Sequence, residues 1–148
     1  IHEEGKSFFI AIGHPRKRKQ IHNKINSENY TSLISKQVGI ISEYTLIGKG
    51  SLIQPLCCIS HNVKIGISNV IHAKTLIGHD VILKDYVTIG SNVNILKGVI
   101  IDNYTVIGPN CLIMDNVKIG KNVFIEPGVV VKHDIPDNTT VEYSFLKH

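Results

Sequence analysis

The sequence predicts an all-β chain folded as a parallel β-helix, and three observations support that prediction. An aliphatic residue recurs at every sixth position from Ile41 to Val131, with no miss and no insertion. Small or β-branched side chains form a second column two residues earlier in each repeat, which only Asn69 interrupts. Gly, Asn and Asp are frequent between the two columns, where tight turns would lie. We therefore expect very short strands, three of which complete one triangular coil of roughly 18 residues.

The period of six also excludes the main helical alternative. An amphipathic α-helix repeats its apolar stripe about every 3.6 residues, which does not match this pattern. β-branched side chains favour a pleated, stacked surface, on which each coil packs its aliphatic residue against the coil below. We place the β-helix domain at residues 33–140 and a C-terminal tail at residues 141–148, in which Val141–Leu146 can form one last strand.

The first 32 residues have a different character. Phe8–Gly13 has the pattern of a buried strand that ends in a glycine turn, and Pro15 then opens a polar, basic stretch, Arg16–Asn26, that is typical of a short helix. One strand and one helix cannot bury their own apolar faces. We therefore expect residues 1–32 to be the C-terminal remnant of an α/β, Rossmann-like domain whose earlier part precedes this sequence.

The composition is that of an ordinary folded domain, with 148 residues of which 43% are hydrophobic and 19% charged. The net charge of +4 suits an anionic small molecule such as a nucleotide or CoA and does not require nucleic acid. No apolar stretch is long enough to cross a membrane. Cys57, Cys58 and Cys111 lack zinc-ligand spacing, so we expect no metal site and free thiols in a reducing, cytoplasmic environment.

Three segments resemble a known family. They are Ile10–Gly13 followed by Arg18, then Ile77–Asp80 followed by Val87–Ile89, and finally the ending Val117–Asn138. Together they resemble the bacterial sialic acid O-acetyltransferases and the UDP-4-amino-sugar N-acetyltransferases of the bacillosamine and perosamine pathways, which belong to the hexapeptide-repeat superfamily.

The resemblance implies a fold, an assembly and an activity. The β-helix would wind left-handed, which is an exception to the usual right-handed crossover, and residues 1–32 would close a sugar-nucleotide-binding domain. Chains of this family form homotrimers and hold the co-substrate acetyl-CoA in the cleft between neighbouring subunits. The implied activity is the direct transfer of an acetyl group from acetyl-CoA to a sugar or nucleotide-linked amino sugar in bacterial surface-glycan biosynthesis.

The resemblance also implies the site residues. The histidine of the family's Ile-x-His-Asp motif is the general base, which gives that role to His79, with Asp80 orienting its imidazole. This suits the chemistry, because an imidazole of ordinary pKa, about 6.5, can accept the proton that the attacking sugar loses. The family's oxyanion donor is a backbone N–H one coil beyond the base, and that count reaches Lys97.

On the same resemblance we expect two groups of binding residues. The acetyl-CoA-binding residues are Lys97, Gly98 and Asp115, and the acceptor-binding residues are Gly13, Arg18 and His72.

Several alternatives remain open at this point. The acetylated group can be a sialic acid hydroxyl instead of an amine, and the chain can be a non-catalytic β-helix scaffold. A trimeric β-helix carbonic anhydrase is excluded, because His61 and His79 are not followed at the required spacing by further zinc-binding histidines. The basic cluster Arg16–Lys19 matches a nucleic-acid-binding patch, but we interpret it as the first turn of a surface helix.

Overall fold

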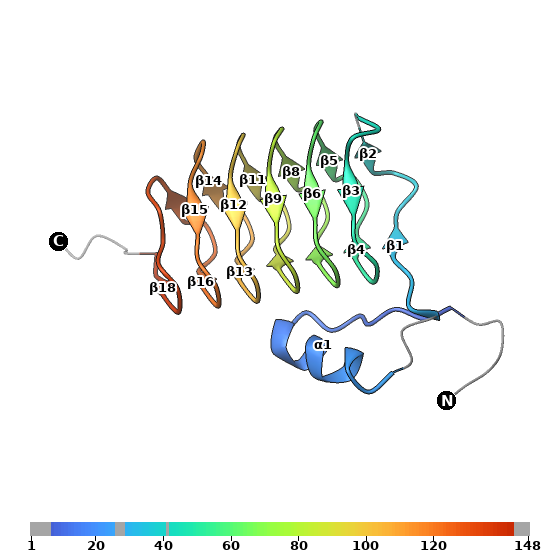
Figure 1. The fold of residues 1–148 in the computed structure, drawn as a ribbon. Helices are drawn as coiled ribbons and strands as arrows, with labels where there is room; N and C mark the ends of the chain where they lie inside the picture. The colour runs from blue at the N-terminus through green and yellow to red at the C-terminus, as the bar shows by residue number, and fades with distance from the viewer. Residues whose placement is uncertain (1–6, 26–28, 41, 144–148) are drawn as a thin grey trace.

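The structure, a computed structural model, is a left-handed β-helix with a short helix packed on one of its faces (Figure 1). It describes residues 7–25, 29–40 and 42–143. Within these residues, eighteen strands of two residues each form three parallel sheets, which are the faces of a triangular prism.

The three sheets are numbered in chain order. The first sheet contains β1 (Leu33–Ile34), β4 (Leu52–Ile53), β7 (Val70–Ile71), β10 (Thr88–Ile89), β13 (Val106–Ile107), β16 (Phe124–Ile125) and β18 (Thr140–Val141). The second contains β2 (Gly39–Ile40), β5 (Cys58–Ile59), β8 (Leu76–Ile77), β11 (Asn94–Ile95), β14 (Leu112–Ile113) and β17 (Val130–Val131). The third contains β3 (Leu46–Ile47), β6 (Lys64–Ile65), β9 (Ile82–Leu83), β12 (Ile100–Ile101) and β15 (Lys118–Ile119).

Each strand pairs with the strand one coil further on, and the partners are 18 residues apart through most of the chain, as in Leu52 with Val70. From β3 to β17 the second residue of each strand points into the prism because side chains alternate along a strand. Ile59, Ile77 and Ile95 are accordingly 0% exposed. The predicted β-helix and its aliphatic core are confirmed.

The register changes at both ends of the prism. Ile34 and Ile40 pair with Ile53 and Ile59, in each case 19 residues on, so the first coil holds one extra residue and the strand register runs through Ile40. The sequence prediction that the column begins at Ile41 is therefore wrong by one position, and Ile41 itself lies outside the described residues. Two adjacent isoleucines made the two registers indistinguishable. At the other end Ile125 pairs with Val141, so the last coil is two residues short.

The one irregular residue of the small column, Asn69, is fully buried and bonded on every side. Its Nδ2 donates to the carbonyl oxygens of Gly66 and Lys84 at 2.9 and 3.0 Å, and its Oδ1 accepts from the backbone N–H of Val87 at 2.7 Å. The amide stays inside the prism because each of its polar atoms has a partner there.

The N-terminal segment meets the prediction only in part. Helix α1 (Pro15–His22) has Pro15 in its first turn, as expected, and ends at His22 instead of continuing to Asn26. Phe8–Gly13 is not a strand. Within the described residues, its one β-type pairing is an isolated parallel bridge between Phe8 and Tyr30. A strand needs a paired neighbour along its length, and the part of the chain that the structure describes offers this segment none.

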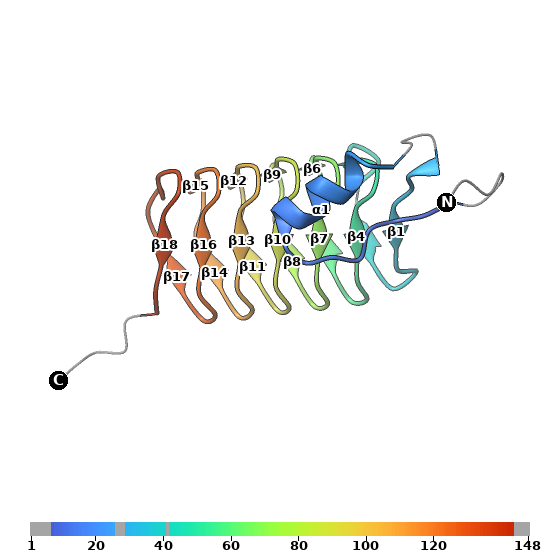
Figure 2. The same ribbon diagram turned by 90° about the horizontal axis from the view of Figure 1, so that it is seen from below.

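The segment is nevertheless fixed to the prism. Figure 2 shows α1 lying across the first sheet. The ring of Tyr30 is 4% exposed and fills the space above Gly50, where any Cβ would overlap it. Two later turns on the same edge of the prism as Gly50 also contact the helix. His22 Nδ1 lies 2.6 Å from the hydroxyl of Tyr86, and Lys19 donates to the hydroxyl of Tyr104 at 2.6 Å. Within the described residues, no helix has the length and apolarity to span a membrane.

Candidate active site

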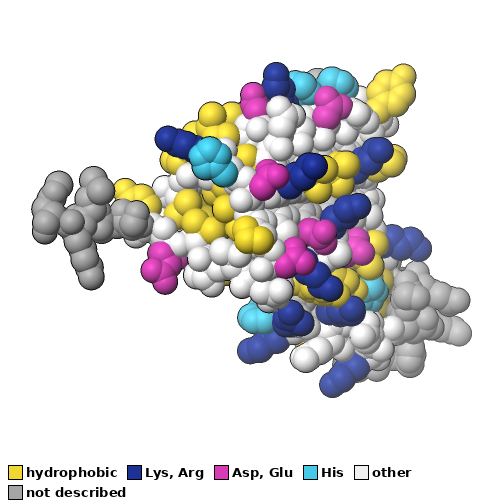
Figure 3. Space-filling view, turned by 60° about the vertical axis from the view of Figure 1, so that its left-hand side comes forward, with side chains coloured by type: hydrophobic (Ala, Val, Ile, Leu, Met, Phe, Trp, Pro, Cys, Tyr) yellow, Lys and Arg dark blue, Asp and Glu magenta, His cyan; other side chains and the backbone are white. Residues whose placement is uncertain are grey.

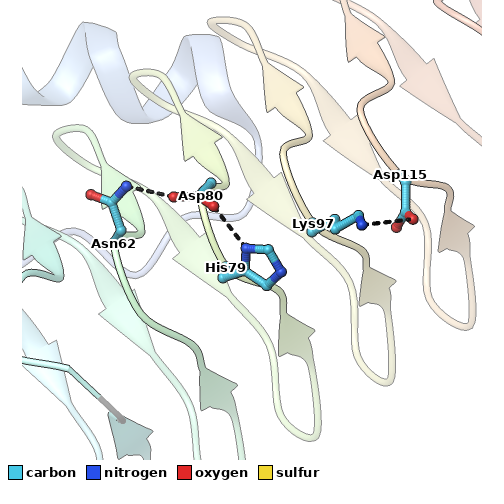
Figure 4. Close-up of polar contacts among 5 residues, drawn as sticks. All are labelled: Asn62, His79, Asp80, Lys97 and Asp115. Carbon is cyan, nitrogen blue, oxygen red and sulfur yellow. Dashed lines mark hydrogen bonds and ion pairs between the residues drawn. The ribbon is translucent and has the colours of Figure 1, made fainter.

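We call the edges of the prism corner 1 (between the first and second sheets), corner 2 (second and third) and corner 3 (third and first). Corner 2 carries His79 and Asp80, which follow β8. His79 Nδ1 lies 2.7 Å from Asp80 Oδ2, and the two side chains are 44% and 47% exposed (Figure 4). Asp80 is in the left-handed backbone region, with φ of 61°, as are the equivalent residues of other turns. The tight turn thereby presents both side chains outwards.

Asp80 fixes the tautomer of His79. The hydrogen bond with His79, followed by one from Asn62, lowers the pKa of Asp80 below its ordinary value. The ionised carboxylate only accepts hydrogen bonds, so a neutral His79 ring carries its proton on Nδ1. Nε2 then keeps a free lone pair, and Figure 4 shows this second ring nitrogen pointing away from Asp80. A lone pair held in this way is chemically able to accept a proton.

The coil before this pair supports it. Asn62 Nδ2 donates to Asp80 Oδ1 at 2.5 Å. The rings of His61 and His79 stack with centroids 5.5 Å apart and planes inclined by 16°. Both contacts join residues 18 positions apart, so the same stacking that forms the core also forms this cluster.

Backbone donors distinguish corner 2 from corner 3. At the middle of the corner 3 turns, the N–H groups of Ile67, Asp85 and Lys121 donate to side-chain oxygens of the next turn, at 3.0, 2.8 and 2.8 Å. In the described residues of corner 2, the equivalent N–H groups of His79 and Lys97 have no acceptor in the protein. An exposed N–H without a partner is free to bind a ligand.

Corner 1 offers fewer such donors. Three of its middle positions are prolines, Pro55, Pro109 and Pro127, which have no N–H. At a fourth, Ala73 donates its N–H to Gln54 Oε1 at 3.1 Å. Corner 2 is therefore the edge that combines free backbone donors with the His79–Asp80 pair.

The next two coils continue the same edge. Lys97 Nζ lies 4.0 Å from Asp115 Oδ2 (Figure 4), and the N–H of Gly98 donates to the carbonyl of His79 at 3.0 Å. A Cβ on Gly78 would lie 2.9 Å from the backbone nitrogen of Lys97, so the two turns are in close contact. The structure thus brings His79, Asp80, Lys97, Gly98 and Asp115 onto one edge, while their roles stay predictions.

The predicted acceptor-binding residues lie elsewhere. His72 is half-buried on corner 1, where its Nδ1 is 3.2 Å from Gln54 Oε1. Burial, with a smaller contribution from the charge of Arg18, lowers the pKa of His72. Gly13 and Arg18 lie against the first sheet, which is the face opposite corner 2 (Figure 1). One chain does not bring the two predicted groups of residues together.

Arg18 is completely buried, and all of its donors are used within the protein. Its Nε donates to Ser68 O at 2.7 Å, Nη1 to the carbonyls of Ile12 and Gly13 at 2.6 and 2.9 Å, and Nη2 to Val87 O and Thr88 Oγ1 at 3.1 and 3.2 Å. Burial lowers its pKa to about 10, so it stays charged at neutral pH. Arg18 therefore ties the N-terminal segment to the β-helix, and no N–H remains to support its predicted contact with the acceptor.

The sequence prediction missed a hollow beside α1. Its volume is about 540 Å³, and its lining includes Gly13, His14, Arg16, Tyr104 and Asn122. Residues separated by about a hundred positions meet there, so no local motif could have indicated it. Among the described residues, no group of three or more His, Cys, Asp or Glu side chains could hold a metal ion.

Known proteins share the fold. The family model described as bacterial transferase hexapeptide (six repeats) matches residues 98–133. No curated protein matches the chain.

Several solved structures are similar over most of this chain. A variant of perosamine N-acetyltransferase from Caulobacter crescentus, in complex with CoA and GDP-perosamine, has 22% identity and a TM-score of 0.87 and covers 91% of this chain. The acetyltransferase domain of PglB from Neisseria gonorrhoeae, in complex with acetyl coenzyme A, has 22% identity and a TM-score of 0.86 and covers 90%. WeeI from Acinetobacter baumannii has 25% identity and a TM-score of 0.89 and covers 96%. The matches span 65%, 66% and 70% of those three chains, respectively.

Proposed function

Since the chain is a left-handed β-helix of hexapeptide repeats, we propose that it is an acetyltransferase that moves an acetyl group from acetyl-CoA to a sugar, with a nucleotide-linked amino sugar as the favoured acceptor. The observation that carries the proposal is the His79–Asp80 pair, on the edge that also has free backbone donors. Structures of the same fold contain CoA with GDP-perosamine, or acetyl coenzyme A, and these ligands support the assignment.

The side chains of corner 2 suggest a direct transfer. Nε2 of His79 accepts the proton of the acceptor amine or hydroxyl while that nitrogen or oxygen attacks the thioester carbonyl. Asp80 stabilises the imidazolium that forms. The backbone N–H of Lys97, one coil away, receives the developing oxyanion. As the C–S bond breaks, the imidazolium returns a proton to the sulfur, so no covalent enzyme intermediate is required.

The edge beyond His79 suits a long, anionic co-substrate. The free N–H groups of His79 and Lys97 lie on successive turns and can donate to the amide groups of a pantetheine chain, and Gly98 has no side chain to obstruct the turn, with φ of 67°. The ammonium of Lys97, paired at 4.0 Å with Asp115, supplies a positive charge on the same edge. Lys97, Gly98 and Asp115 are therefore the proposed acetyl-CoA-binding residues.

The acceptor requires a second copy of the chain. The hollow that Gly13 lines is next to the first sheet, whereas the base is at the opposite corner. We propose that the hollow binds the acceptor and that, in a homotrimer, it faces corner 2 of a neighbouring subunit. His72, on corner 1, lies outside the hollow's lining, and its predicted contact with the acceptor also depends on this assembly.

The test is thiol release from acetyl-CoA with a panel of UDP- and GDP-linked amino sugars and sialic acid. We expect turnover on one class of acceptor and a drop of about a hundredfold or more in kcat for His79→Ala. Lys84→Ala changes an exposed side chain on corner 3 and serves as the control.

Other outcomes would change the assignment. Full activity in His79→Ala would show that His79 is not the general base. Preference for sialic acid would indicate O-acetylation. An absence of turnover on every acceptor, together with no thermal stabilisation by acetyl-CoA, would support a non-catalytic scaffold.

A further inference from the structure

We propose that His61, one coil before the base, is a positioning residue that fixes the imidazole plane of His79. The inference deepens the proposed function and rests on it for its kinetic consequences. The rings of His61 and His79 are stacked, with centroids 5.5 Å apart and planes only 16° from parallel.

His79 needs such support because it is anchored at one atom only. Its side chain is 44% exposed, and its hydrogen bond to Asp80 holds Nδ1 alone. An imidazole held at one nitrogen can still tilt about that bond, which moves Nε2 across its working position. The flat contact with His61 removes this freedom from one side of the ring.

The preceding coil supports the other member of the pair as well. Asn62 donates to Asp80 Oδ1 at 2.5 Å, and the backbone N–H of Asp80 donates to the carbonyl of His61 at 3.2 Å. Two consecutive residues, His61 and Asn62, thus hold two consecutive residues of the next turn. The carboxylate is fixed by a hydrogen bond and the imidazole by a stacked ring.

The stack leaves the other side of the imidazole open. On corner 2 the order of the turns is His61, His79 and then Lys97, so His61 covers the side of the ring that faces away from the proposed oxyanion donor. The side towards Lys97 is left for the reacting groups. Displacing a catalytic group by about 1 Å can lower the rate about a hundredfold, so we expect a tilt of this ring to lower kcat.

Steady-state kinetics separate positioning from other roles. His61→Ala removes the stack, and we expect kcat to fall about tenfold while KM for acetyl-CoA changes less than about twofold. His61→Phe restores a flat ring at the same place and should recover most of kcat. Lys84→Ala is the matched surface control. Unchanged kcat in His61→Ala would overturn the proposal, as would a loss that appears in KM and is not rescued by Phe.

A second measurement does not depend on turnover. In protein with ¹⁵N-labelled histidine, long-range nitrogen–proton correlations report the tautomer and ring environment of each imidazole, and His79→Gln identifies the signals of His79. We expect a single Nδ1–H tautomer for His79 in the wild type and in His61→Phe. His61→Ala should give shifted, exchange-broadened signals. Identical His79 signals in all three proteins would refute the positioning role, even if no acceptor were acetylated and the proposed function itself had failed.

Discussion

At the scale of single residues, Arg18 joins the N-terminal segment to the β-helix through five hydrogen bonds, and its removal should lower stability. Arg18→Met keeps much of the side-chain volume but removes all five hydrogen bonds, three of which go to the buried residues Ser68, Val87 and Thr88. Leaving buried acceptors unpaired costs about 1–3 kcal/mol per group, so we expect a loss of about 3 kcal/mol or more in the free energy of unfolding. Urea denaturation followed by circular dichroism measures it.

Arg16→Met is the control for that loss. Arg16 is exposed, and its guanidinium donates to the side chain of Asn122 at 2.9 Å, so its removal should cost less than about 1 kcal/mol. Equal losses in the two variants would mean that the burial of Arg18 adds nothing to the free energy of unfolding beyond what an exposed arginine contributes.

The same residues show which parts of the site the sequence could predict. His79 and Asp80 are neighbours in one turn, and Lys97 follows at a fixed repeat distance, so a local motif and a period sufficed to predict that they share an edge. The partners of Arg18 obey no period. They come from Gly13, Ser68 and Thr88, which meet only because α1 packs on the first sheet.

At the scale of elements, the start of α1 was predictable and the state of Phe8–Gly13 was not. Pro15 favours a first helical turn through its own fixed φ, which is a local property. A strand depends on a partner, and Tyr30 supplies only a single bridge. The corner that receives Tyr30 is likewise not marked by a motif, because Gly50 resembles any other turn glycine in the repeat.

Two half-buried histidines, His22 and His72, predict a pH-dependent stability. Burial lowers the pKa of both His72 and His22 below the ordinary value of about 6.5. Below about pH 6.5 the unfolded chain therefore binds more protons than the folded chain, so stability is greatest above that pH and falls as the pH is lowered.

His72→Asn removes one of these two groups and keeps a polar side chain. We expect its free energy of unfolding to decline less than that of the wild type between pH 7.5 and pH 5, as measured by urea denaturation at each pH. His72→Asn combined with His22→Asn should flatten the profile further, and Lys84→Ala should leave it unchanged. A decline as steep as the wild type's in the double variant would contradict this origin.

At the scale of the whole molecule, the regular coil of the β-helix determines which residues lie on the same edge of the prism. Residues 18 apart lie one above another, so the corner that carries His79 and Lys97 could be predicted from the period. The period does not reveal which corner has free N–H groups. Whether an N–H group is free depends on the side chains of the next turn. On corner 3, for example, Asp85 and Asn103 accept hydrogen bonds from the backbone N–H groups of the preceding turns.

The outer faces beside corner 2 carry several apolar side chains among polar ones. Figure 3 shows hydrophobic side chains gathered between charged ones on the coils nearest the C-terminus. On the second and third sheets the outward residues of successive strands include Leu76, Ile82, Ile100, Leu112 and Val130. Leu76 is 41% exposed and precedes His79 by three positions. A neighbour packed there would bring a second chain next to His79.

The proposed homotrimer gives the last prediction. Sedimentation equilibrium should report a mass of about three times 16.4 kDa for this chain. Leu76→Asp places a charge on the apolar face, so we expect it to dissociate the assembly and to lower acetyl transfer in the same proportion, because the acceptor hollow and His79 then stay on opposite sides of one chain. Lys84→Ala should remain trimeric and active. A monomeric Leu76→Asp protein with undiminished turnover would show that one chain contains the whole site, and the acceptor would then have to bind beside corner 2 itself.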